Sequence, residues 1–173
     1  MRRLILFRHA KAERPLPGSP DRARALTERG RQDAEAIGAY MAGHALVPEH
    51  VLVSPALRTQ QTWQCAAPAF KPAPGTGTVD RLYDATAQDI LAAVKQAPAR
   101  CQSLLVIGHN PGLHELAQIL TGTGERETRE RLSEKLPTSG LVVIDFSVDD
   151  WGGVQPQSGR LERFVTPKSL SGA

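Results

Sequence analysis

The stretch VLVSPALR, residues 51–58, contains the change from strand to helix that decides the fold class. The apolar run 51–53 predicts a short buried strand. Ser54 can cap the N-terminus of a helix and Pro55 suits the first helical position, so a helix is predicted to follow, ending at about residue 67. One strand therefore leads directly into one helix.

The same order recurs on both sides of this segment. Residues 4–7 predict a buried strand, followed by a long charged loop to about residue 24 and a helix that starts at Thr27. Further along, residues 86–94 predict a helix, 104–107 a strand and 113–120 a second helix. Strands that alternate with amphipathic helices predict a mostly parallel sheet that is covered on both faces.

The remaining segments complete this prediction. Residues 79–83 are predicted to form a short extended segment, and 125–135 a solvated helical face or a mobile loop. Residues 141–146 and 161–165 are predicted to form a hairpin with an edge strand. The expected architecture is a three-layer α/β/α sandwich, with a mostly parallel central sheet and an antiparallel edge, in a single domain spanning 1–173.

Composition excludes several classes of protein. The chain has 173 residues, 40% of them hydrophobic, and a net charge of +3. Nine basic and three acidic residues lie in positions 1–31, so the positive charge is local and favours a local anionic ligand over a nucleic acid or a membrane surface. With no apolar run near the length of a membrane span, a soluble, cytoplasmic protein is expected. The two cysteines stand far apart, which disfavours a disulfide framework, a structural zinc site and a redox dithiol.

Polar residues follow three of the predicted strands. Arg8 and His9 come directly after the first, Arg58 after the second and His109 after the third. The carboxyl ends of parallel strands form the ligand crevice of open α/β sheets, so these side chains are predicted to converge. Two arginines suit a phosphoryl group, and two histidines offer a nucleophile and a charge-stabilising partner. No metal or other cofactor is expected, because the arginines supply the positive charge.

At these positions the sequence resembles the histidine phosphatase superfamily, whose nucleophilic histidine lies in an Arg-His-Gly motif after the first strand. The resemblance covers most of the chain and rests on LFRHAK (6–11), RALTERG (24–30), VLVSPALRTQQT (51–62) and VIGHNPG (106–112). The compact chain and its Gly-His-Asn-Pro-Gly form are most similar to the small SixA-like phosphohistidine phosphatases. The resemblance implies a phosphoglycerate mutase-like fold.

Carried over position by position, the resemblance implies that His9 is the phosphorylated nucleophile. It makes Arg8 and Arg58 the phosphate clamps and His109 the second histidine of the pocket. Arg24, in the family-like stretch DRARALT (21–27), is a candidate for a further phosphate contact.

The sequence departs from the family pattern at two points. Ala10 replaces the usual motif glycine and would be strained at a positive φ. No segment reproduces the carboxylate that larger members use as a general acid, and Asp84 is the best candidate. A weak acid is tolerable if the leaving group is the imidazole of phosphohistidine, because that nitrogen can arrive already protonated.

Several readings remain open from sequence alone. Lys11 either steers phosphate or is simply solvated, and Ser54 either contacts phosphate or only caps its helix. The partner is expected to be a phosphorylated substrate, with a phosphohistidine-carrying signalling protein as the leading candidate. The alternatives are a small-molecule phosphomonoesterase of the same superfamily and a module that binds phosphate or phosphohistidine without turnover.

Overall fold

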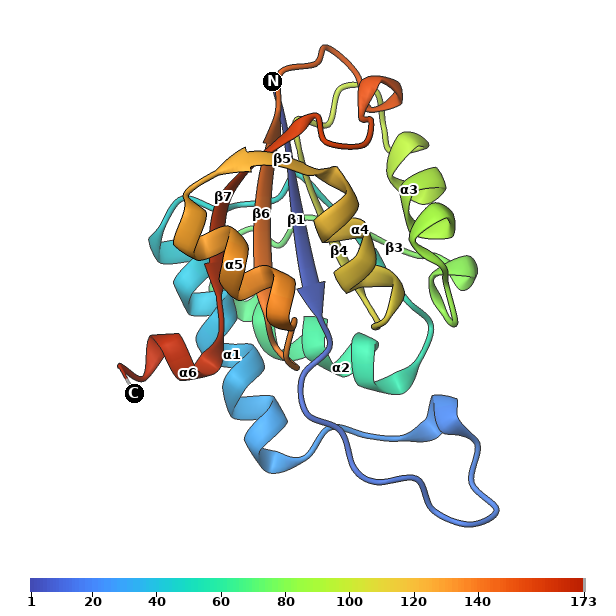
Figure 1. The fold of residues 1–173 in the computed structure, drawn as a ribbon. Helices are drawn as coiled ribbons and strands as arrows, with labels where there is room; N and C mark the ends of the chain where they lie inside the picture. The colour runs from blue at the N-terminus through green and yellow to red at the C-terminus, as the bar shows by residue number, and fades with distance from the viewer. Residues whose placement is uncertain (173) are drawn as a thin grey trace.

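A single mixed sheet forms the centre of the computed structural model, which describes residues 1–172 (Figure 1). The strand order is β3-β2-β4-β1-β6-β7-β5. The strands are β1 (Arg2–Arg8), β2 (His50–Val53), β3 (Gly75–Thr78), β4 (Ser103–Gly108), β5 (Thr121–Gly124), β6 (Leu141–Phe146) and β7 (Gly159–Val165). The α-helices are α1 (Glu28–Gly43), α2 (Leu57–Ala66), α3 (Ala87–Lys95), α4 (Gly112–Leu120), α5 (Arg126–Glu134) and α6 (Pro167–Leu170).

The sheet is parallel where the candidate site lies and mixed beyond it. β3, β2, β4 and β1 pair in parallel, whereas β6 pairs antiparallel with both β1 and β7. This arrangement confirms the predicted α/β architecture. One detail is wrong: β7 is not the edge strand, because β5 pairs with its other side in parallel.

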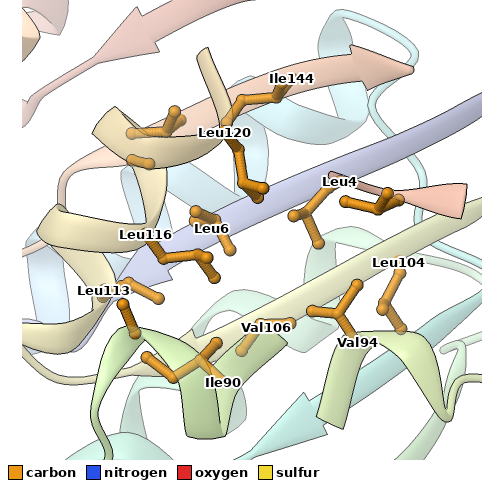
Figure 2. Close-up of a cluster of buried hydrophobic side chains, with 14 of the residues drawn as sticks. Leu4, Leu6, Ile90, Val94, Leu104, Val106, Leu113, Leu116, Leu120 and Ile144 are labelled. Carbon is orange, nitrogen blue, oxygen red and sulfur yellow. The ribbon is translucent and has the colours of Figure 1, made fainter. Parts of the chain in front are cut away.

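Side chains of β1 alternate between the two faces of the sheet, which gives the molecule two apolar layers. Leu4 and Leu6 pack with α3 and α4 on one face, and Figure 2 shows this cluster around Leu116 and Ile90. Ile5 and Phe7 pack on the opposite face with α1 and α2. Burial on both faces explains why residues 4–7 of β1 are all apolar.

Two further segments differ from the sequence prediction. Residues 79–83 do not form a strand: Asp80–Leu82 is a short 3₁₀ helix, and the strand β3 lies just before it, in a segment for which no strand is predicted above. The solvated helical face predicted over 125–135 is confirmed as α5, in which only Leu132 is buried.

No helix in the described part of the chain combines the length and apolar character needed to cross a membrane.

Candidate active site

The ends of β2, β4 and β1 bring the predicted residues together. Arg8 pairs with Gly108 in the β1–β4 register, and the backbone N–H of His9 donates to the Gly108 carbonyl at 3.1 Å. His9 and His109 therefore leave adjacent strands at the same level, and their ring centroids lie 5.3 Å apart. The convergence of these side chains follows directly from the parallel register.

The helix α2 supplies the second arginine. It begins at Leu57, two residues later than Ser54 and Pro55 suggest, so Arg58 lies in its first turn. The Arg58 side chain is buried, with only 7% of its surface exposed. Thr62, one turn further, accepts from the backbone N–H of Ala10 at 2.9 Å and donates to the Arg58 carbonyl at 2.7 Å. This threonine ties the loop after β1 to the helix that carries Arg58.

A close backbone contact with the start of α1 holds the same loop in place. The backbone N–H of Thr27, the N-cap of α1, donates to the Lys11 carbonyl at 2.9 Å. A Cβ atom at Gly30 would lie 2.2 Å from that carbonyl oxygen, so only glycine permits this approach. Ala10 has no positive φ, and its side chain is fully buried without the strain that the motif substitution could have caused.

The proton on the His9 ring has a defined place. Nδ1 lies 2.8 Å from the carbonyl oxygen of Ala10, and because a carbonyl only accepts, Nδ1 carries the proton and donates it. Burial lowers the pKa of His9 to about 3, which outweighs the opposing effect of this hydrogen bond. The ring is therefore neutral at pH 7, with its lone pair on Nε2.

His109 is held by Ser54, for which the sequence suggested either a phosphate contact or a helix cap. Ser54 Oγ lies 2.7 Å from His109 Nε2, and the side chain of Ser54 is fully buried. Burial, followed by the charge of Arg58, lowers the pKa of His109 to about 4. If the serine hydroxyl donates to Nε2, the neutral ring carries its proton on Nδ1.

Buried polar atoms without partners gather in this region. In residues 1–172 five such side-chain atoms are found, and three are Arg8 Nε, Arg58 Nε and His109 Nδ1. A fourth, Ser139 Oγ, belongs to a residue whose backbone N–H donates to the carbonyls of Arg8 and His9. Buried donors are nearly always satisfied in folded proteins, so this concentration indicates a binding site for an acceptor-rich ligand.

Arg8 is anchored by a segment that lies before β6. Its Nη1 donates to the Leu136 carbonyl at 3.1 Å, and Asn110 Nδ2 donates to the same oxygen at 2.8 Å. Burial, followed by the charge of Arg58, lowers the pKa of Arg8. Two guanidinium groups are thus held close together, an arrangement that a bound anion would stabilise.

The other two predicted site residues, Arg24 and Asp84, lie in different surroundings. Arg24 Nε donates to Asp21 Oδ1 at 3.0 Å, and its Nη1 donates to the Glu13 carbonyl. Arg24 is thus joined to Arg58 through a shared carboxylate. Asp84 is exposed and has a φ of 54°, and no hydrogen bond within residues 1–172 connects its carboxylate to the other candidates.

Sequence reasoning missed two groups at the site, Asp21 and Tyr83. Asp21 accepts from Arg58 Nη2 at 3.0 Å and from the Tyr83 hydroxyl at 2.5 Å. The Tyr83 ring meets His109 edge-on, with centroids 5.7 Å apart. The family-like stretch DRARALT contained Asp21, but no periodicity or spacing indicated which side chain its carboxylate would meet.

Histidines that stay neutral when buried make stability depend on pH. His9 has a pKa of about 3 in the folded chain and 6.5 as its ordinary value, so between these pH values the unfolded chain binds more protons. The free energy of unfolding is therefore expected to fall on acidification, by about 2 kcal/mol from His9 alone between pH 7 and pH 5. Urea unfolding at both pH values measures this loss. The loss should be smaller in His9→Ala, and an identical loss in both proteins would contradict the prediction.

Among the described residues, no group of three or more His, Cys, Asp or Glu side chains is arranged to hold a metal ion.

Comparisons with known proteins agree with this geometry. Residues 4–90 match the family model of the histidine phosphatase superfamily (branch 1). An uncharacterized protein from Mycobacterium tuberculosis is 33% identical over 165 residues, covering 94% of this chain and 100% of the relative.

Solved structures are similar over nearly the whole chain. The putative phosphohistidine phosphatase SixA from Agrobacterium tumefaciens has 32% identity and a TM-score of 0.81, covering 96% of this chain and 98% of that one. The putative phosphohistidine phosphatase SixA from Nakamurella multipartitia has 25% identity and a TM-score of 0.83, with 96% of each chain covered. The protein whose strand ends unite Arg8, His9, Arg58 and His109 belongs to the histidine phosphatase superfamily, and it is SixA-like.

Proposed function

We propose that the protein is a metal-independent phosphatase that acts through a phosphoryl group carried on His9, with protein phosphohistidine as its substrate. Family membership supports phosphatase function in general. The observation that carries the proposal is the hydrogen bond from His9 Nδ1 to the Ala10 carbonyl. It leaves Nε2 of a neutral, buried imidazole as the free nucleophilic atom.

The reaction then has two steps. The Nε2 lone pair of His9 attacks phosphorus, an N–P bond forms, and the bond to the leaving group breaks. Water next attacks phosphorus, the N–P bond breaks, and its electron pair returns to His9 Nε2. Inorganic phosphate leaves with the two protons of the water, and His9 is neutral again. No cofactor takes part in either step.

The surrounding side chains stabilise the charge on the transferring group. Arg8 and Arg58 remain cationic and hold phosphoryl oxygens, which is the main requirement of phosphoryl transfer. An anion beside His109 raises the pKa of that imidazole from its low value in the free protein. His109 can then donate from Nδ1 as a neutral or a protonated ring.

The need of the leaving group for a proton favours one class of substrate over the other. Asp21 has a pKa lowered to about 2, chiefly by the Tyr83 hydroxyl and then by Arg58, so it is ionised at neutral pH and is a poor proton donor. Asp84 as a general acid stays a prediction. An imidazole that leaves with its own proton needs no such acid, which favours phosphohistidine over a phosphomonoester. The names of the two similar SixA structures support the same substrate class.

A substrate panel tests this proposal. We expect turnover of a phosphohistidine-bearing carrier protein to exceed that of phosphoserine peptides, sugar phosphates and nucleotides by about a hundredfold or more in kcat/KM, the lower end of what general-acid assistance typically contributes. Activity should persist in EDTA. Released phosphate, measured with and without the chelator, reports both expectations.

Other outcomes of the panel point to the alternatives. Faster turnover of a small phosphomonoester would identify a small-molecule phosphatase, and binding of phosphohistidine without release would identify a binding module. Loss of activity in EDTA, restored by a divalent ion, would overturn metal independence.

A further inference from the structure

The candidate phosphate clamp Arg58 already holds an anionic group from its own chain. Its Nη1 donates to the Asp21 carbonyl at 3.0 Å and its Nη2 to Asp21 Oδ2 at 3.0 Å. Both terminal nitrogens are therefore engaged, while Nε is buried without a partner. The Asp21 side chain is 45% exposed, so its far side faces solvent.

Asp21 is held in place by groups from two sides of the site. Tyr83 donates its hydroxyl to Oδ2, and Arg24 donates Nε to Oδ1 at 3.0 Å. Arg22 lies over the Tyr83 ring, with its guanidinium carbon 4.4 Å from the centroid. Through these contacts the long loop after β1 packs against Tyr83.

Carboxylate and phosphoryl oxygens bind a guanidinium in the same forked geometry. A phosphoryl group can use both terminal nitrogens of Arg58 only after the Asp21 carboxylate has left Nη2 and the Asp21 carbonyl has left Nη1. A singly charged anion carries no more negative charge than the Asp21 carboxylate, so it gains nothing by replacing that carboxylate at Arg58. A phosphoryl dianion carries more negative charge, and it also contacts Arg8 and the two histidines.

We propose that Asp21 is a specificity-determining residue: binding of a phosphorylated substrate exchanges the Asp21 carboxylate for phosphoryl oxygens at Arg58, so that weaker anions are excluded. The proposal rests on the proposed function, because it assumes that phosphate binds between Arg58 and His9. The exchange also frees the loop around Asp21 from Arg58 and from Tyr83.

Affinity for inorganic phosphate tests the exchange without turnover. Asp21→Asn removes the competing charge, and we expect the Kd for phosphate, measured by calorimetry, to fall about three- to tenfold. Asp33→Asn is the matched control, since Asp33 is paired with Arg29 at 3.1 Å on α1, outside the site. Its Kd should equal that of the unmodified protein. Thermal unfolding checks that each variant is folded.

A second measurement follows the loop itself. Trypsin can cut after Arg22, which is exposed, and cleavage in the loop is expected to accelerate when phosphate is added, because Asp21 leaves Arg58. In Asp21→Asn, cleavage should be fast without phosphate. If that variant does not fold, Tyr83→Phe, which removes one donor from Asp21, should lower the Kd in the same direction by a smaller factor.

The outcomes separate this proposal from the proposed function. An unchanged or higher Kd in Asp21→Asn, with phosphate binding still abolished by Arg58→Ala, would overturn the exchange and leave the phosphate site intact. Failure of the unmodified protein to bind phosphate would overturn both.

Discussion

The His9→Ala protein is expected to lose at least about a thousandfold in phosphatase kcat, the largest effect we expect from any single substitution. The reason is that His9 Nε2 is the only protein atom in the proposed mechanism that forms a bond to phosphorus. Arg8, Arg58 and His109 would remain and still bind the substrate. The KM is therefore expected to change far less than the kcat.

The loss should be accompanied by loss of the covalent intermediate. Brief incubation with a labelled phosphate donor, followed by denaturation, should leave acid-labile, alkali-stable phosphate on the unmodified protein and none on His9→Ala. His44→Ala is a matched control, because His44 stacks on Tyr40 at the far end of α1. A His9→Ala protein with near-normal turnover would refute the mechanism.

Replacement of Arg58 by alanine is expected to lower kcat/KM by about a hundred- to a thousandfold. The buried guanidinium provides fixed positive charge where negative charge gathers on the phosphoryl group. Its loss also removes the two hydrogen bonds that Arg58 donates to Asp21, one to the backbone carbonyl and one to the carboxylate, each 3.0 Å long. Both effects act on substrate binding and on the reaction step, so KM and kcat should change together.

Two further variants make this result interpretable. Arg58→Lys keeps the charge but loses the fork, so its activity should lie between those of the unmodified protein and Arg58→Ala. Arg29→Ala, which removes an arginine paired with a carboxylate outside the site, should retain full activity. Comparable losses in Arg29→Ala and Arg58→Ala would show that the effect is not specific to the clamp.

Strong local signals made the central part of the fold predictable. Continuous apolar runs are typical of strands buried on both faces, and β1, β2 and β4 are such strands. Once these three are parallel neighbours, the residues after them must meet at one edge of the sheet. Arg8, His9, Arg58 and His109 therefore follow from topology together with three short motifs.

The strands that sequence reasoning missed carry no such signal. β3 has the sequence GTGT and β5 has TGTG, and neither contains an apolar side chain that alternation could reveal. β5 also pairs with β7 in parallel, although the two are separated by β6 in the chain. Such pairings depend on the shape of the assembled sheet and not on local sequence.

The position of Asp21 was hidden for a different reason. The loop from His9 to Thr27 is rich in proline and charged residues, and its path is set by contacts with distant parts of the chain, such as that between Asp21 and Tyr83. A single sequence gives no pattern for such contacts. The role of Ser54 was partly hidden as well, because helix capping explained a serine that in fact contacts His109.

The place of β4 and β1 in the strand order has a consequence for local unfolding. They are the third and fourth of the seven strands, whereas β3 and β5, neither of which has a buried residue, form the rims. Segments with few buried contacts fray first, and the fully buried centre opens only in the global transition. The backbone that presents His9 and His109 therefore belongs to the last cooperative unit to exchange its amide hydrogens, while the loop that carries Asp21 can open and close many times above an intact pair of histidines.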